Sequence, residues 1–339
     1  MDQNNLMTDP AGIETATAQS RARMRQHAAE SAGWGGYPDR LAAKLFVSAM
    51  YLACGIFLAL VIGLFLELLL NSLPSIRAFG LSFLWSSSWD PVASKFGALP
   101  FIYGTVVSST VAIVLAGAIG VLAAIYLAEF SPDWVSTPLG FLIELLAAVP
   151  SVVYGLWGLF VLAPIIRNIL GPFLQHGLGF LPLFTGPIYG VGMLAAVLIL
   201  ALMIVPTVAA ISRDVIAAVP QTQREAMLAL GATRWEVIRR VVLPTARIGI
   251  FGACILALGR AIGETIATTM VIGNRPVISA SLFAPGYTLS SVIANEFTEA
   301  TTTVYLSALV ELGLLLFIVS MIVNGLARLL LWSIVRPAK

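Results

Sequence analysis

Three polar side chains stand at four-residue intervals inside an otherwise apolar stretch of the C-terminal half. The stretch reads GRAIGETIATTMVIGN, and it contains Arg260, Glu264 and Thr268. We expect a continuous helix here, which would set all three side chains on one polar stripe. An arginine near the middle of a membrane span costs roughly 2.5 to 3.5 kcal/mol on insertion scales, so the stripe should face a helix bundle or a water-filled path.

The chemistry of this stripe suits a tetrahedral oxyanion. The guanidinium of Arg260 offers forked donors that match the oxygens of such an anion, Glu264 can orient it, and Thr268 can add a hydroxyl contact. We therefore expect these three residues in a substrate path. The alternative is an intrahelical ion pair between Arg260 and Glu264 that only neutralises its members.

A second segment, from Pro220 to Pro244, contains several residues that typically start or end helices. It reads PQTQREAMLALGATRWEVIRRVVLP. Pro220 suits a first helical turn, and Gly231 suits a left-handed helix end. Thr233 followed by Glu236 forms a capping box, and Pro244 should stop the second helix. The sequence therefore predicts two short helices joined by a tight turn.

Both short helices carry apolar residues at helical spacing, and an apolar face needs a partner. Ala226, Ala229 and Leu230 form this face on the first helix, and the second helix has a similar set: Trp235, Ile238, Val241 and Val242. The face could pack on the protein's own membrane domain or dock into another protein. A DNA-binding helix-turn-helix is disfavoured, because a loop tethered to the membrane at both ends cannot easily place a recognition helix in the major groove of DNA.

The composition requires a membrane protein. The chain has 339 residues, of which 59% are hydrophobic and 11% charged, and its mean hydropathy is +0.94. A helix needs about 20 apolar residues to cross a bilayer. Six runs meet this length, and we expect an all-α, polytopic fold with spans near 45–70, 104–128, 138–162, 187–211, 248–273 and 304–330.

The remaining segments are polar. We expect a polar N-terminal tail over residues 1–44, whose few apolar residues favour disorder. A membrane domain should cover 45–330 with a polar loop at 212–247, and a C-terminal segment should cover 331–339. No nucleic-acid patch is implied by the net charge of +2.

The distribution of basic residues predicts the orientation. Fourteen Lys and Arg residues fall on one side of the expected spans: Arg21, Arg23, Arg25, Arg40, Lys44, Arg213, Arg224, Arg234, Arg239, Arg240, Arg247, Arg328, Arg336 and Lys339. Only four fall on the other: Arg77, Lys95, Arg167 and Arg275. Since the cytoplasmic side keeps the excess, both termini and the loop at 212–247 should be cytoplasmic.

Several function classes are excluded or weakened. Neither histidine lies in a span, which argues against an intramembrane protease, and no metal site is expected. No lysine follows a glycine, so the chain has no P-loop. A secondary transporter or a channel remains open on hydropathy alone. The acids Glu67, Glu144 and Glu311 are expected to have structural roles. Glu67 and Glu311 lie near span ends, so we expect them to reach the end of the span or to pair locally.

The loop resembles a known family. Glu225, Ala226 and Met227, then Gly231, then Val241, Leu243 and Pro244 resemble the EAA loop of ABC importer permeases, with departures from the usual residues at Met227 and Val241. Three further stretches resemble the PstC-type permeases of phosphate-specific importers: GRAIGET, WDPVASKFGALPFIYGT and TLSSVIANEF. The likeness covers about residues 45 to 330.

The resemblance implies a function and an assembly. It implies a type I ABC importer permease that moves inorganic phosphate across the bacterial inner membrane, with Arg260 and Glu264 in transport. It implies an ATPase-docking surface at Glu225, Ala226, Gly231, Leu243 and Pro244. The expected partners are a PstA-type permease, a PstB-type ATPase dimer that uses ATP, and a PstS-type periplasmic phosphate-binding protein. No cofactor or catalytic residue is expected on this chain itself, and sulfate or molybdate is the rival substrate.

Overall fold

The computed structural model describes residues 40–335, with side chains described from 44 to 332. In this part of the chain every regular element is a helix, and the only β-type pairing is a single bridge between Asp90 and Lys95. The all-α fold is thus confirmed. The expected polar tail lies outside the described residues up to position 39, as do residues 336–339, while α2 (Arg40–Phe79) already begins at Arg40.

Six helices in the described residues are long and apolar enough to cross a membrane, which is the expected number. They cover Lys44–Phe79, Leu99–Phe130, Ser151–Leu178, Met193–Ala217, Arg234–Gly263 and Thr303–Trp332. The first, second and sixth contain the expected apolar runs. The other three have different bounds, and prolines, glycines and a capping side chain explain the differences.

The third span was predicted at 138–162, and this prediction is wrong. Helix α5 (Asp133–Ala147) ends before Pro150, whose backbone is extended, and a new helix begins at Ser151. A proline lacks the amide donor and disfavours helical backbone in the preceding residue, so an unbroken apolar sequence becomes two helices. The new helix runs through α6 (Ser151–Trp157), η2 (Gly158–Leu162), α7 (Ala163–Ile165), η3 (Ile166–Leu170) and α8 (Gly171–Leu178).

The fourth and fifth spans also differ from the prediction. Helix α9 (Met193–Ala217) starts after Gly192, at a φ of 157°, rather than near residue 187. The fifth span joins α11 (Arg234–Val237), η5 (Ile238–Val242) and α12 (Leu243–Gly263) without interruption, so Pro244 does not stop a helix. The wider turn of η5, in which the Leu243 amide donates to the Ile238 carbonyl, precedes the proline and accommodates it.

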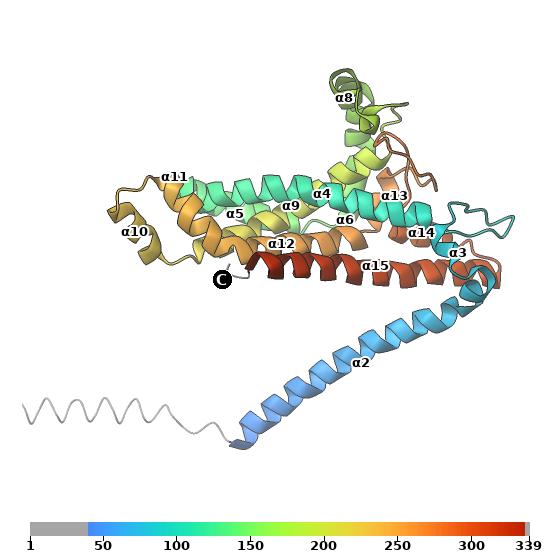
Figure 1. The fold of residues 1–339 in the computed structure, drawn as a ribbon, viewed down its shortest axis with the longest axis horizontal. Coiled ribbons are helices and arrows are strands. Elements are labelled where there is room, and N and C mark those ends of the chain that lie inside the picture. The colour runs from blue at the N-terminus through green and yellow to red at the C-terminus, as the bar shows by residue number, and fades with distance from the viewer. Residues whose placement is uncertain (1–39, 336–339) are drawn as a thin grey trace, which may run out of the picture. The chain divides into compact units, whose positions relative to one another are not determined.

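The core lies between α9 and α4 (Leu99–Ile125), which run side by side with α12 and α15 (Thr303–Val335) in Figure 1. Small residues let the backbones of α4 and α9 approach closely: a Cβ at Gly120 would lie 2.9 Å from the Val208 Cβ. Ala112 and Ala116 on the same helix are fully buried. This close packing gives the bundle a rigid centre on which other elements are positioned.

The chain divides into two units, residues 1–66 and 67–339. In the first, nearly all described side chains are exposed. In the second, the end of α2 is tied to α15: the Ser307 hydroxyl accepts from the Ser75 amide at 3.0 Å and donates to the Asn71 carbonyl at 2.9 Å. Pro74 lies between these residues within the helix.

One end of the second unit is organised around Glu296, the last residue of α14 (Leu289–Glu296). Its carboxylate accepts from the Trp89 indole at 2.8 Å, from the Tyr305 hydroxyl at 2.7 Å and from the Tyr287 hydroxyl at 3.3 Å. Trp89 packs edge-on against Phe96 and Phe101. This cluster holds the segment between α3 (Ser82–Trp85) and α4 against the start of α15.

Glu296→Leu should therefore destabilise the protein, because it leaves the Trp89 and tyrosine donors without their acceptor. We expect a loss of about 3 kcal/mol in the free energy of unfolding. Thermal unfolding in detergent would show a midpoint lower by roughly 5 to 10 °C. Glu299→Leu is the matched control, since Glu299 is exposed. Equal shifts of the unfolding midpoint for the two variants would show that the hydrogen bonds to Glu296 do not stabilise this end of the protein.

Candidate functional site

The polar stretch of the fifth span is broken at Glu264, so the expected continuous stripe is wrong. Helix α12 ends at Gly263, Glu264 has extended backbone with ψ at 124°, and α13 (Ile266–Val271) begins two residues later. The Glu264 carboxylate accepts the Ala267 amide at 3.1 Å. A side-chain acceptor of this kind satisfies an amide in the first turn of the new helix, and it competes with continuation of the old one.

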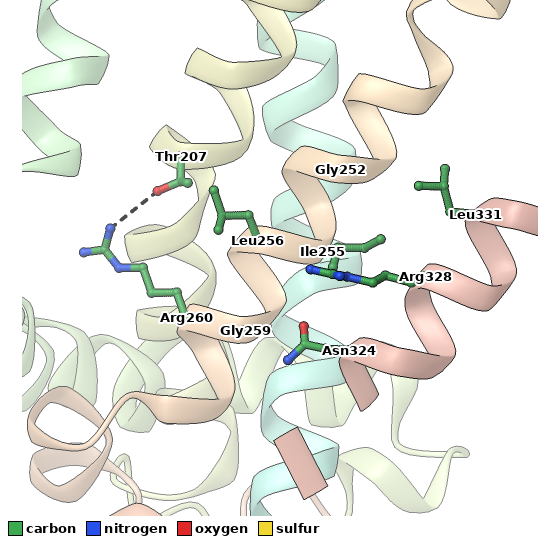
Figure 2. A pocket seen from close by; sticks show the side chains of 9 residues that line it. All are labelled: Thr207, Gly252, Ile255, Leu256, Gly259, Arg260, Asn324, Arg328 and Leu331. Carbon is green, nitrogen blue, oxygen red and sulfur yellow. Dashed lines mark hydrogen bonds between the residues drawn. The ribbon is translucent and has the colours of Figure 1, made fainter. Parts of the chain in front are cut away.

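The break separates the charges of Arg260 and Glu264. Among the described residues, no carboxylate lies within 4.0 Å of the Arg260 guanidinium, whose one hydrogen bond runs to the Thr207 hydroxyl at 3.5 Å. Figure 2 shows Arg260 reaching from α12 toward Thr207 on α9. The alternative of a self-neutralising ion pair between Arg260 and Glu264 is therefore not formed.

Arg260 lies at a pocket of about 770 Å³ between α9, α12 and α15 (Figure 2). Five of the nine lining residues are apolar or glycine, and the other four are polar or charged. The residues that line it are Thr207, Gly252, Ile255, Leu256, Gly259, Arg260, Asn324, Arg328 and Leu331. Two guanidinium groups thus share one cavity, and no described carboxylate lies within ion-pair distance of either.

Thr268 does not join Arg260 at this pocket. Its side chain is 1% exposed, and its hydroxyl donates to the backbone carbonyls of Glu264 at 2.8 Å and Thr265 at 2.9 Å. The Ser290 hydroxyl also donates to the Glu264 carbonyl, at 2.8 Å. Thr268 and Ser290 therefore hold the break in place, and Ser290 connects it to α14.

The structure adds residues that sequence reasoning missed. Thr207, Asn324 and Arg328 come from α9 and α15, and only packing brings them beside Arg260. The Asn324 amide donates to the Ser320 carbonyl at 2.8 Å, which leaves its oxygen as an acceptor at the pocket. Of these three residues, only Arg328 could have been suspected from the sequence, because it is a charged residue close to the end of a long apolar run.

The predicted turn between the two helices of the 220–244 segment is confirmed. Helix α10 covers Gln221–Ala229, and Gly231 has a φ of +82°. The Thr233 hydroxyl accepts the Glu236 amide at 3.3 Å, and the Glu236 carboxylate accepts the Thr233 amide at 2.9 Å. The capping box therefore forms as predicted.

The apolar residues of this segment divide between two environments. Val237, Ile238 and Val242 are buried, and Val237 and Val242 pack in one cluster with Ala124 and Ile216 of the membrane domain. A second group of apolar side chains is exposed to solvent: Leu228 is 46% exposed, Trp235 57% and Leu230 82%. Glu225 and Ala226 on α10 are exposed beside them. Packing on the protein's own core thus accounts for Val237, Ile238 and Val242 of the second helix, and the exposed group, which includes Trp235 of that helix, can contact a partner.

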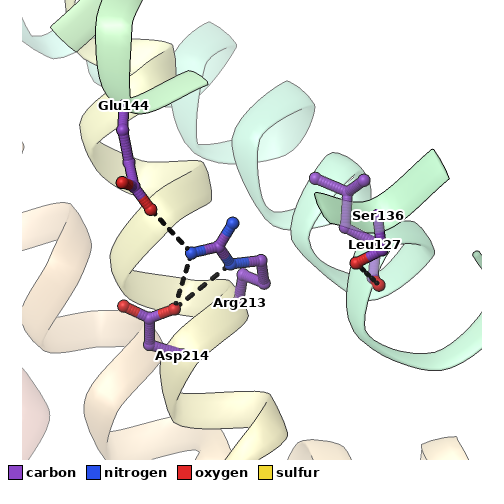
Figure 3. A network of polar contacts seen from close by, with 5 residues as sticks. All are labelled: Leu127, Ser136, Glu144, Arg213 and Asp214. Carbon is purple, nitrogen blue, oxygen red and sulfur yellow. Dashed lines mark hydrogen bonds and ion pairs between the residues drawn. The ribbon is translucent and has the colours of Figure 1, made fainter. Parts of the chain in front are cut away.

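The remaining intramembrane acids differ from one another. Glu67 accepts from Asn71 at 2.7 Å, so it pairs locally as expected. Glu144 of α5 pairs with Arg213 of α9 at 2.9 Å, across 69 positions of the chain (Figure 3). Glu311 does not reach a span end. It is 6% exposed, and its Oε2 has no hydrogen-bond partner among the described residues.

Comparisons with known proteins agree with this architecture. The family model described as "Binding-protein-dependent transport system inner membrane component" matches residues 116–332. The chain is 47% identical to the phosphate transport system permease protein PstC of Mesorhizobium japonicum, across 87% of this chain and 91% of the relative. It is 44% identical to the protein of the same name from Haemophilus influenzae, across 80% and 87%.

Solved structures show the same fold at low sequence identity. A bacterial ABC transporter that imports alginate aligns with a TM-score of 0.54 at 14% identity, covering 88% of this chain and all of that one. The inward-facing MetNI methionine ABC transporter aligns at 0.53 and 17% identity, covering 70% and 95%. From the match to the family model and the identity to these relatives, the chain belongs to the binding-protein-dependent transport system inner membrane component family, among the PstC-type permeases.

Proposed function

We propose that this protein is a permease subunit of an ATP-driven importer that moves inorganic phosphate across the bacterial inner membrane. The single observation that carries the substrate is the 47% identity, over nearly the whole chain, to a relative named as a phosphate transport system permease. The pocket at Arg260 supplies chemistry that fits this substrate.

Arg260 is the proposed contact for the anion. A phosphate that enters an apolar pocket must exchange its hydration for protein donors, and a planar guanidinium can donate two hydrogen bonds to two of its oxygens. Because no described carboxylate neutralises Arg260 or Arg328, both charges are available to an anion in this pocket. Glu264 and Thr268 contribute indirectly, since they fix the break that ends α12 beside the arginine.

The guanidinium alone does not set the selectivity among oxyanions. A guanidinium binds any tetrahedral oxyanion, so sulfate and molybdate remain the rival substrates. Uptake of labelled phosphate by a strain that lacks its own phosphate permease and carries this gene with its partners tests the assignment. Excess sulfate or molybdate should not compete, and uptake of sulfate in place of phosphate would refute it.

The proposed assembly has four kinds of partner chain or surface. A PstA-type permease would cover the open pocket, and a PstB-type ATPase dimer would dock on Glu225, Ala226 and the exposed apolar group beside them. Gly231 shapes that surface, whereas Leu243 and Pro244 lie within the fifth helix and support it. A PstS-type binding protein would deliver phosphate, and lipid would surround the spans. ATP would be hydrolysed on the partner ATPase.

We further propose that both termini and α10 face the cytoplasm, because 14 of the 18 basic residues other than Arg260 lie in the N-terminal tail, in the 212–247 segment or near the C-terminus. Cysteine labelling in a background without Cys54 and Cys254 tests this orientation. A membrane-impermeant thiol reagent added to intact cells should label Val92→Cys, since Val92 is 97% exposed. It should not label Arg234→Cys, and labelling of that site from outside would reverse the assignment.

The role of Arg260 is tested by two substitutions. Arg260→Gln should lower phosphate uptake by at least about 30-fold, since the pocket loses a charged donor of the anion. Arg260→Lys keeps the charge and loses the planar fork, so it should recover little. Both variants should insert and assemble normally, which immunoblots of purified complexes would verify. Wild-type uptake by a stably assembled Arg260→Gln variant would remove the arginine from the substrate path.

The role of the docking turn is tested at Gly231, where an added Cβ would meet no atom within 4 Å. Gly231→Val should impair copurification of the ATPase and phosphate uptake, because a β-branched residue at this positive φ is strained by roughly 1 to 2 kcal/mol. Gly231→Asn is the matched control, since asparagine tolerates the left-handed conformation. Normal docking and uptake by the valine variant would contradict the assignment of this loop.

A further inference from the structure

Arg224 of α10 makes an ion pair with a residue 95 positions away. Its Nη2 lies 2.9 Å from the Glu129 Oε1 on η1 (Tyr126–Phe130), the turn that extends α4. The same Nη2 donates to the Ile216 carbonyl at the end of α9, at 2.8 Å. One guanidinium thus joins three elements: the docking helix and the ends of the two helices that form the core.

This pair is shielded from solvent, unlike the other described ion pairs. The side chains of Arg224 and Glu129 are 15% and 12% exposed, whereas the carboxylate partners of Arg213, namely Glu144 and Asp214, are 60% and 69% exposed (Figure 3). The Nε of Arg224 is buried without a partner. A shielded pair is screened less by water and salt, and loss of one member leaves the other charge largely shielded and without its partner.

Little else holds α10 to the membrane domain. None of its residues is buried, and Met227 is its only residue in the adjoining apolar cluster. The chain itself connects α10 to α9 through Ala218, Val219 and Pro220, and to the fifth span through the Gly231 turn. Its one described polar contact with the α4 helix and its extension is the Arg224–Glu129 pair.

The position of the pair suggests what it transmits. Arg224 directly precedes Glu225, which is exposed in the proposed docking surface. Glu129 lies in the last turn of the helix that packs on α9 along the core. We propose that the Arg224–Glu129 pair is the link through which movement of the docked ATPase is transferred from α10 to α4 and α9. Both are positioning residues, and this inference rests on the proposed function.

The test uses the reconstituted complex of permease, ATPase and binding protein, and it measures phosphate taken up per ATP hydrolysed. Arg224→Met and Glu129→Leu each leave a largely shielded charge without its ion-pair partner, so they should also lower the yield of complex. The double variant Arg224→Met/Glu129→Leu replaces the pair with apolar side chains and should restore the yield. Its uptake per ATP should stay at least about threefold below wild type, because packing alone lacks the directional link.

Arg239→Met is the control, because it removes an exposed arginine for which the described residues offer no ion pair, and its ratio should match wild type. A double variant with full yield and the wild-type ratio would overturn the inference and leave the proposed function intact. A wild-type complex that hydrolyses ATP and takes up no phosphate would instead refute the function. If both single variants lower the yield of complex but keep the wild-type uptake of phosphate per ATP, the pair has only a structural role. That result also overturns the inference.

Discussion

An arginine inside a membrane-spanning helix must have its charge compensated, and in this protein the nearest candidate in the sequence does not do so. Glu264 stands one helical turn beyond Arg260, where a continuous helix would pair the two. The helix instead ends between them, and the Glu264 carboxylate caps α13. The guanidinium is left with the Thr207 hydroxyl and an apolar pocket, in a medium that strengthens any contact with an anion.

The rest of the structure keeps that arrangement in place. Small residues of α4 allow close contact with α9, which provides a rigid wall for the fifth span. At one end Glu296 gathers Trp89, Tyr287 and Tyr305, and at the other Arg224 joins α10 to the ends of α4 and α9. Glu296 and Arg224 are therefore each compensated by partners within the chain, whereas no described carboxylate pairs with Arg260 or Arg328 at the pocket.

Local features of this fold could be predicted from the sequence. The number of spans depends on apolar runs of about 20 residues, whereas the Gly231 turn and the Thr233–Glu236 capping box depend on residues within one helical turn. All three are continuous stretches of sequence, and all three are confirmed. The wrong predictions concern how the backbone uses its prolines and polar residues. Pro150 breaks a helix, whereas Pro244 does not because η5 widens the turn before it. The sequence alone does not distinguish these two outcomes.

The site was less predictable for a different reason. Arg260 is visible as a charge in an apolar run, but Thr207, Asn324 and Arg328 become its neighbours only through the packing of α9, α12 and α15. The same holds for Glu129 and Arg224, which are 95 positions apart. Long-range pairings of this kind leave no spacing signal along the chain.

The central claim is that Arg260 serves the anion and is not a partner for Glu264. It is tested most directly by phosphate uptake in the neutral double variant Arg260→Gln/Glu264→Gln, compared with Arg260→Gln alone. If the arginine serves the anion, the double variant stays as inactive as the single one, because no guanidinium remains at that position. If the two residues only neutralise each other, removing both charges together restores uptake to the wild-type rate, and that result would contradict this account.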